Sequence, residues 1–207
     1  MPLDLKALLA PSHTALLMME CQEGIIGSGG KLGALAEAVE RHGTVGHIAR
    51  VLCAARNAKA TIVHCTMSRR PDGAGAVANC LLLAATAKRS VGLLPGSPQQ
   101  AVVAPLAPQD GEWLLTRYHG VTPFHGTELD PILRNLGVTT LVATGVSVNV
   151  GILGLTIEAV NAGYQVVIPR EAVAGTPDQY VDAVMEHTLR LLATIATVDQ
   201  VLEAWGR

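Results

Sequence analysis

Two features of the sequence combine residue types and spacing that could support hydrolysis. Glu20 follows the apolar run 15–19, and a carboxylate at the end of a buried strand is a candidate general acid or base. The second feature is the small-residue segment 145–151, which joins the apolar run 139–144 to a helical pattern. Such a turn presents backbone N–H groups and the positive end of a helix dipole, so it could stabilise an oxyanion.

The elements that position these residues follow from apolar runs that alternate with helical patterns. Strands are predicted at residues 15–19, 61–65, 113–117, 139–146, 165–169 and 193–197. Helices are predicted at 35–52 with a bend near Gly43 and Gly46, and at 76–88, 127–137, 153–160, 178–192 and 198–205. This alternation predicts a three-layer αβα fold, doubly wound and Rossmann-like, around a mostly parallel six-stranded sheet.

Composition limits the classes of function. A chain of 207 residues that is 49% hydrophobic predicts one domain over residues 1–207. The net charge of -2 and the aromatic content of 3% give no support for binding to nucleic acid or to an anionic membrane. The first residues lack the pattern of a signal peptide, so a cytoplasmic location is expected. Neither the cysteine spacing nor the histidine spacing predicts a metal site, and no cofactor is expected.

Several polar residues at predicted strand ends are candidates for the same pocket. Arg117 could bind a carboxylate through two hydrogen bonds if the strand register points it inward. His64 and His119 could also line the pocket, although a structural role is at least as well supported for each. Ser147 and Cys65 are possible nucleophiles, but the sequence assigns a general base to neither.

Short segments in a consistent order resemble the isochorismatase-like cysteine hydrolase superfamily. Residues 15–22 resemble its first strand, residues 124–129 its Phe-x-x-Thr-x-Leu segment, and residues 145–151 its nucleophile turn. Residues 158–166 and the pair Glu171-Ala172 resemble patterns that follow this turn. The resemblance extends over roughly residues 12–200. It implies the three-layer fold predicted above and a homo-oligomer.

The resemblance also implies positions for the catalytic groups, which in this family are Asp, Lys and Cys. Glu20 falls at the position of the Asp, Gly151 at that of the Cys, and Tyr118 at or beside that of the Lys, with Arg117 as its neighbour. The chain therefore resembles a form of the family that lacks the catalytic cysteine and lysine. Isochorismatases resemble it in having glycine at the cysteine position, and they use the carboxylate as an acid.

The implied function is hydrolysis of a small metabolite without a cysteine nucleophile, through Glu20 and the backbone amides of the 145–151 turn. A cis peptide is implied near Val146-Ser147. The residues expected to bind substrate are Gln22, His64, Arg117, His119, Phe124, Val146, Ser147 and Val150. The alternative is a catalytically inactive member of the family that binds a small molecule or a protein partner.

Overall fold

The computed structural model describes residues 4–27, 33–88 and 92–206, and seven strands in these residues form one parallel sheet. The sheet has the order β3-β2-β1-β4-β5-β7, and the short strand β6 pairs with β4 outside this path. The strands are β1 (Thr14–Met19), β2 (Thr61–Met67), β3 (Trp113–Arg117), β4 (Thr140–Val146), β5 (Gln165–Pro169), β6 (Val173–Ala174) and β7 (Thr194–Ala196).

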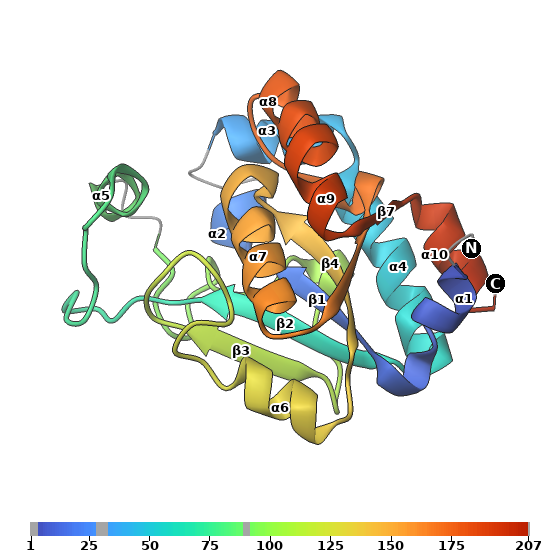
Figure 1. Cartoon of the computed structure of the whole chain (residues 1–207). Coiled ribbons are helices and arrows are strands. Elements are labelled where there is room, and N and C mark those ends of the chain that lie inside the picture. Colours follow the sequence, from blue (N-terminus) through green and yellow to red (C-terminus); the bar gives the residue numbers. More distant parts are fainter. Residues whose placement is uncertain (1–3, 28–32, 89–91, 207) are drawn as a thin grey trace.

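Helices cover both faces of this sheet and complete three layers (Figure 1). The helices are α1 (Leu5–Leu8), α2 (Glu23–Ile26), α3 (Ala34–Arg41), α4 (Thr44–Ala58), α5 (Leu81–Lys88), α6 (Leu129–Asn135), α7 (Leu153–Asn161), α8 (Asp178–Val184), α9 (Arg190–Leu192) and α10 (Val198–Ala204). Helices α4 and α10 pack in one apolar cluster, and α6, α7 and α8 pack in the other. No helix in the described residues is long and apolar enough to cross a membrane.

The two central strands explain why the sheet lies at the core. Every residue of β1 and β4 is buried, as expected for parallel strands that are covered on both faces. Successive side chains alternate between the two apolar clusters, so Leu16 packs with α4 and Leu17 packs with α7. Met19 at the end of β1 lies beside Cys65 of β2 and Gly145 of β4. The carboxyl ends of the strands therefore meet at one edge.

The structure confirms the predicted fold class, with differences in single elements. The predicted sheet lacks only β6, whose two residues are too few to show a periodic pattern. The predicted bent helix 35–52 is two helices, α3 and α4, separated at Gly43 in the left-handed conformation. The helix predicted at 76–88 begins only at Leu81, and the helix predicted at 178–192 contains a π-helical segment at Met185–Leu189.

Candidate active site

The carboxylate of Glu20 lies where the sequence places it, directly after β1. Its backbone N–H donates to the carbonyl oxygen of Cys65 at 2.9 Å, which continues the ladder between β1 and β2 by one residue. Its φ is 54°, a left-handed conformation that is uncommon outside glycine. The side chain thus leaves the strand direction, and 17% of it is exposed. This is the exposure expected of a carboxylate that faces a cavity.

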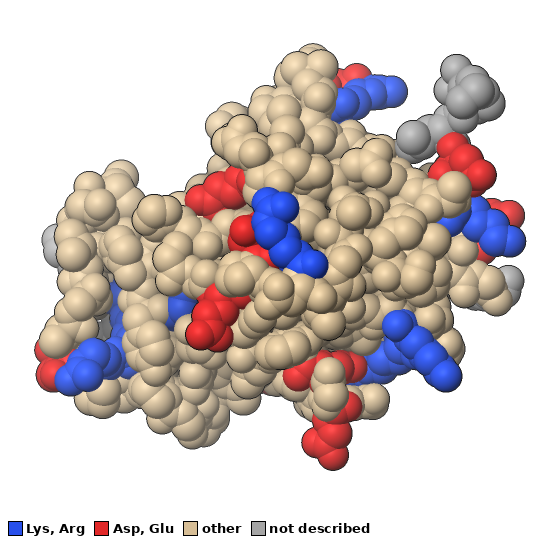
Figure 2. Space-filling view, turned by 60° about the horizontal axis from the view of Figure 1, so that its bottom comes forward, with Lys and Arg blue, Asp and Glu red and all other residues tan. Residues whose placement is uncertain are grey.

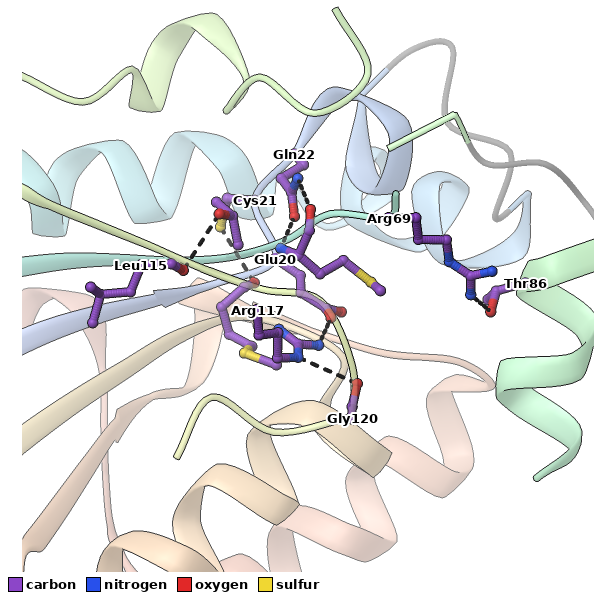
Figure 3. A network of polar contacts seen from close by, with 11 residues as sticks. Glu20, Cys21, Gln22, Arg69, Thr86, Leu115, Arg117 and Gly120 are labelled. Atoms are coloured by element: carbon purple, nitrogen blue, oxygen red, sulfur yellow. Dashed lines mark hydrogen bonds and ion pairs between the residues drawn. The ribbon is translucent and has the colours of Figure 1, made fainter. Parts of the chain in front are cut away.

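Arg117 forms an ion pair with Glu20. Its Nη2 donates to Oε1 of Glu20, and its Nε donates to the carbonyl oxygen of Gly120 at 3.3 Å (Figure 3). The parallel register sets Arg117 beside Met67, so the last residue of β3 reaches the end of β1 across β2. The guanidinium is 4% exposed, and its Nη1 is buried without a hydrogen-bond partner in the described residues. One strong donor therefore remains available for a ligand.

The turn after β4 contributes backbone rather than side chains. The Val146–Ser147 peptide bond is cis, as the family resemblance implies. A π-helical turn, η3 (Val148–Ile152), follows, and the N–H of Ile152 donates to the carbonyl oxygen of Ser147 at 2.9 Å. It continues into α7, so the amino end of a helix begins at Ser147. This end of a helix favours negative charge.

Gly151 lies where the turn has no space for a side chain. A Cβ atom on this residue would lie 2.8 Å from the carbonyl oxygen of Val146 and 3.2 Å from Cε of Met19. The first distance is shorter than ordinary van der Waals contact with a backbone atom that cannot rotate away. A cysteine at this position would require the backbone of the turn to move.

A cavity of about 90 Å³ joins these groups. Glu20, Arg117, Ser147, Val150 and Gly151 all line it. The remaining wall is largely aliphatic and includes Ile25, Leu35, Leu82, Leu83, Leu93 and Val121. Five of the predicted site residues are thus adjacent in space although they lie on three different strand ends.

Arg69 is the residue of this cavity that the sequence analysis missed. It follows β2 by two residues, lines the cavity, and donates from Nη2 to the hydroxyl of Thr86 on α5 at 2.8 Å (Figure 3). It belongs to none of the ion pairs found among the described residues. In the sequence, the pair Arg69-Arg70 could have indicated a cationic site. The predicted strand ended at Cys65, so this pair was not expected to lie at the edge of the sheet.

Tyr118 and His119, which were predicted at the site, do not line the cavity with Glu20. Tyr118 is 50% exposed, and both residues line a second hollow along β3, which shares Arg117 and Gly120 with the cavity but is not lined by Glu20. The cation beside Glu20 comes from Arg117, one position earlier. Adjacent strand residues point to opposite sides, so an error of one position changes the face on which a side chain lies.

Three further residues predicted to bind substrate have structural roles. The side-chain amide of Gln22 is fully buried and bonded to both backbone groups of Met67 and to the carbonyl oxygen of Gln100. Phe124 packs in the core with its ring 5.9 Å from that of Tyr164. Val146 is buried in β4 and contributes to the site only through its backbone. These residues hold the strand ends in place and do not line the cavity.

His64 lies in the middle of β2, so its prediction as a strand-end pocket residue is wrong. Its Nε2 lies 2.8 Å from Oε2 of Glu112, which also accepts from Arg56. Burial lowers the pKa of His64, against the opposing effect of Glu112. Although burial alone would raise it, hydrogen bonds from Arg56 and His64 lower the pKa of Glu112 to about 2. A neutral His64 imidazole that donates to the Glu112 carboxylate accounts for the lowered pKa of both residues.

We expect acid to destabilise the fold through this cluster of Arg56, His64 and Glu112. The pKa of Glu112 is about 2 when folded against an ordinary 4.5, so its stabilisation is complete above pH 4.5 and is lost as the pH falls toward 2. The lowered pKa of His64 acts in the same direction below its ordinary 6.5. Urea titrations should show the free energy of unfolding falling by about 2 kcal/mol between about pH 5 and pH 3.

The matched variant for this prediction is Glu112→Gln. It should be less stable at neutral pH and should lose less stability than the wild type over the acid range. An acid dependence that is the same in both proteins would show that other carboxylates are responsible.

The remaining chemical candidates are buried or lack an assigned base. Burial raises the pKa of Cys65 to about 12 and also raises that of Cys21, and neither lines the cavity. Cys53 and Cys80 are exposed elsewhere. Among the residues that the structure describes, no group of three or more His, Cys, Asp or Glu side chains could hold a metal ion.

Comparisons with known proteins agree on one family. The Isochorismatase domain family matches residues 14–200. The chain is 30% identical over 112 residues to phenazine biosynthesis protein PhzD1 of Pseudomonas aeruginosa, a match that spans about half of each chain (54%). It is 29% identical over 165 residues to maleamate amidohydrolase of Pseudomonas putida, over 77% of this chain and 71% of the relative. An isochorismatase family protein from Desulfovibrio vulgaris superposes with a TM-score of 0.81 at 25% identity, over 94% of this chain and 98% of that one.

Proposed function

The chain belongs to the isochorismatase family of hydrolases, and we propose that it hydrolyses a small metabolite without a cysteine nucleophile. The observation that carries this proposal is the composition of the cavity. The ion pair of Glu20 and Arg117 and a second arginine, Arg69, line this cavity. The turn at Gly151 also lines it and has no space for a side chain. None of the described residues that line it is a cysteine.

Glu20 is the group that moves the proton in this proposal. The guanidinium of Arg117 donates to this carboxylate and orients it toward the cavity. Glu20 takes a proton from a water molecule, and the hydroxide forms a bond to the carbonyl carbon of the substrate. The bond to the leaving group then breaks, and Glu20 returns the proton to that group. The backbone amides near Ser147 stabilise the negative charge on the carbonyl oxygen.

Arg117 can hold charge but cannot transfer a proton. A guanidinium keeps its proton at any pH at which proteins work, whereas a lysine can give its proton away. Its free Nη1 and its ion pair therefore suit orientation of Glu20 and of the substrate. This leaves Glu20 as the proton-transfer group of the cavity.

Arg69 supplies the site for a carboxylate on the substrate. It lines the cavity, and within the described residues its side chain bonds only to the neutral hydroxyl of Thr86. A carboxylate is the natural second partner for a guanidinium. The small aliphatic cavity suits a short chain, and maleamate, the substrate named for one relative, is a short carboxylate amide.

Replacing Arg69 with Gln tests this assignment. We expect KM for carboxylated substrates to rise about 10- to 100-fold while kcat changes little, because the lost hydrogen bonds act on binding. Arg70→Gln is the control, since Arg70 is exposed and paired with Asp72 outside the cavity. Equal effects of the two variants on KM would refute a carboxylate site at Arg69.

The second candidate function is binding without catalysis. It is favoured by the ion pair, which already neutralises Glu20, and by the closed space at Gly151. Both functions use the same cavity and the same carboxylate site. Turnover therefore distinguishes them, and affinity for a ligand does not.

A further inference from the structure

Helix α5 forms one wall of the cavity although it lies at one side of the molecule. It stands beyond the carboxyl ends of β2 and β3 (Figure 1). Figure 2 shows Lys or Arg side chains recessed between this segment, at the left of the view, and the rest of the molecule. Leu82, Leu83 and Thr86 of α5 line the cavity. The two leucines lie four and three positions before the threonine, so all three residues share one face of the helix.

Thr86 is the polar residue of this face, and its hydrogen bonds have a fixed direction. Its Oγ1 donates to the carbonyl oxygen of Leu83 at 3.0 Å and accepts from Nη2 of Arg69 at 2.8 Å (Figure 3). A hydroxyl has a single proton to donate, so the bond to Leu83 leaves the oxygen lone pairs for Arg69. The hydroxyl of Thr86 is therefore held as an acceptor for the guanidinium.

The long side chain of Arg69 is held at both of its ends. Its backbone N–H donates to the carbonyl oxygen of Leu93 at 2.8 Å, and Leu93 also lines the cavity. Thr86 binds the other end, in the last turn of α5, where the carbonyl end of a helix favours a cation. Arginine has many rotamers, so without the bond to Thr86 the guanidinium would be free to leave the cavity.

The neutral partner of Arg69 leaves its positive charge uncompensated. Arg117 pairs with Glu20, and Arg70 pairs with Asp72. Arg69 forms no ion pair with any residue that the structure describes. A carboxylate at the position of the Thr86 hydroxyl could hold the guanidinium equally well, but it would neutralise the charge. A hydroxyl thus fixes the orientation of Arg69 and preserves its charge for a ligand.

We propose that Thr86 is a positioning residue that gives the cavity its preference for an anionic substrate. It orients the guanidinium of Arg69 in the cavity, and the uncompensated charge binds a carboxylate of the substrate. This role deepens the carboxylate site proposed at Arg69 and rests on it. It places a determinant of specificity on α5, outside the strand ends that carry Glu20 and Arg117.

The kinetic test compares maleamate with its neutral diamide, maleamide, which has the same size. Thr86→Val removes the hydroxyl and keeps the shape of the side chain. We expect KM for maleamate to rise about tenfold in this variant, while kcat and the kinetics of maleamide stay unchanged. Thr86→Ser keeps the hydroxyl and should restore KM to within about threefold of the wild type. A merely structural role of Thr86 would affect both substrates alike.

Thr86→Asp tests the effect of charge at the same position. The new carboxylate neutralises Arg69, so the preference for maleamate over maleamide, as a ratio of kcat/KM, should fall at least about a hundredfold. Ala87→Val is the control for changes in the helix itself, because Ala87 is exposed on α5 and does not line the cavity. This variant should retain the preference of the wild type.

Calorimetric titration with crotonate tests the role independently of turnover, since crotonate has the carboxylate but no amide to hydrolyse. Its Kd should rise about tenfold in Thr86→Val and at least about a hundredfold in Thr86→Asp. If crotonate binds in this way and no substrate is turned over, the proposed hydrolysis fails and the role of Thr86 stands. Equal affinity of the wild type and Thr86→Val for crotonate, or no binding of crotonate to the wild type, would overturn it.

Discussion

Glu20→Gln is expected to lower kcat at least about a hundredfold while KM changes little, because the amide cannot accept and return a proton. The amide oxygen can still accept from Arg117, so the variant keeps the shape of the site. It loses the negative charge that balances a guanidinium with only 4% exposure. We therefore also expect a loss of stability of about 3 kcal/mol, visible in urea denaturation.

Two further variants separate chemistry from folding in this experiment. Glu20→Asp keeps a carboxylate one methylene shorter and should retain part of the turnover, since proton transfer depends on reach. Glu203→Gln removes a carboxylate from the exposed face of α10 and should change neither kcat nor stability. A fully folded Glu20→Gln protein with the turnover of the wild type would remove Glu20 from the mechanism.

Gly145→Ala is expected to destabilise the protein by about 3 kcal/mol or more. Gly145 lies in β4 directly beside the end of β1, and its φ is 103°. A Cβ atom there would lie 2.1 Å from the carbonyl oxygen of Met19 and 2.8 Å from its nitrogen. The two central strands would have to separate where Glu20 leaves the sheet, so activity should fall together with stability.

Two other glycines separate the causes of this effect. Gly137 has a φ of 70° but open space around it, so Gly137→Ala should cost only about 1 kcal/mol for its backbone conformation. Gly46 lies in α4 with ordinary φ and open space, so Gly46→Ala should stabilise by about 0.5–1 kcal/mol. Thermal or urea unfolding of the three variants should give this order, and a tolerated Gly145→Ala would contradict the close approach of β1 and β4.

The fold could be predicted because the strands are long, apolar and separated by helices. Parallel connectivity then fixes which ends of the strands meet, and this predicts that Glu20 and residues 147–151 share one cavity. The limits of single elements were less certain. Strand β2 continues to Met67, two residues beyond its prediction. Thr66 and Met67 still pair with residues of β3, although the apolar pattern weakens there.

The errors in the candidate site come from strand register and from partners distant in the sequence. A shift of one position separates Arg117, which lines the cavity and pairs with Glu20, from Tyr118, which does not line it. The buried role of His64 depends on Glu112, which lies 48 residues away and has no periodic relation to it. Arg69 lines the cavity, and its side chain bonds to Thr86 of α5, 17 residues away in the sequence. Such contacts are set by packing in three dimensions, and no local pattern contains them.

The most direct test of a thiol-independent hydrolase is turnover of isochorismate and of small carboxylated amides after treatment with iodoacetamide. We predict that at least one of these substrates is hydrolysed, that alkylation of the accessible Cys53 and Cys80 leaves kcat unchanged, and that Glu20→Gln abolishes the reaction. Turnover that alkylation abolishes would contradict the account. The absence of turnover for every substrate would contradict it as well and would favour the binding role of the same cavity.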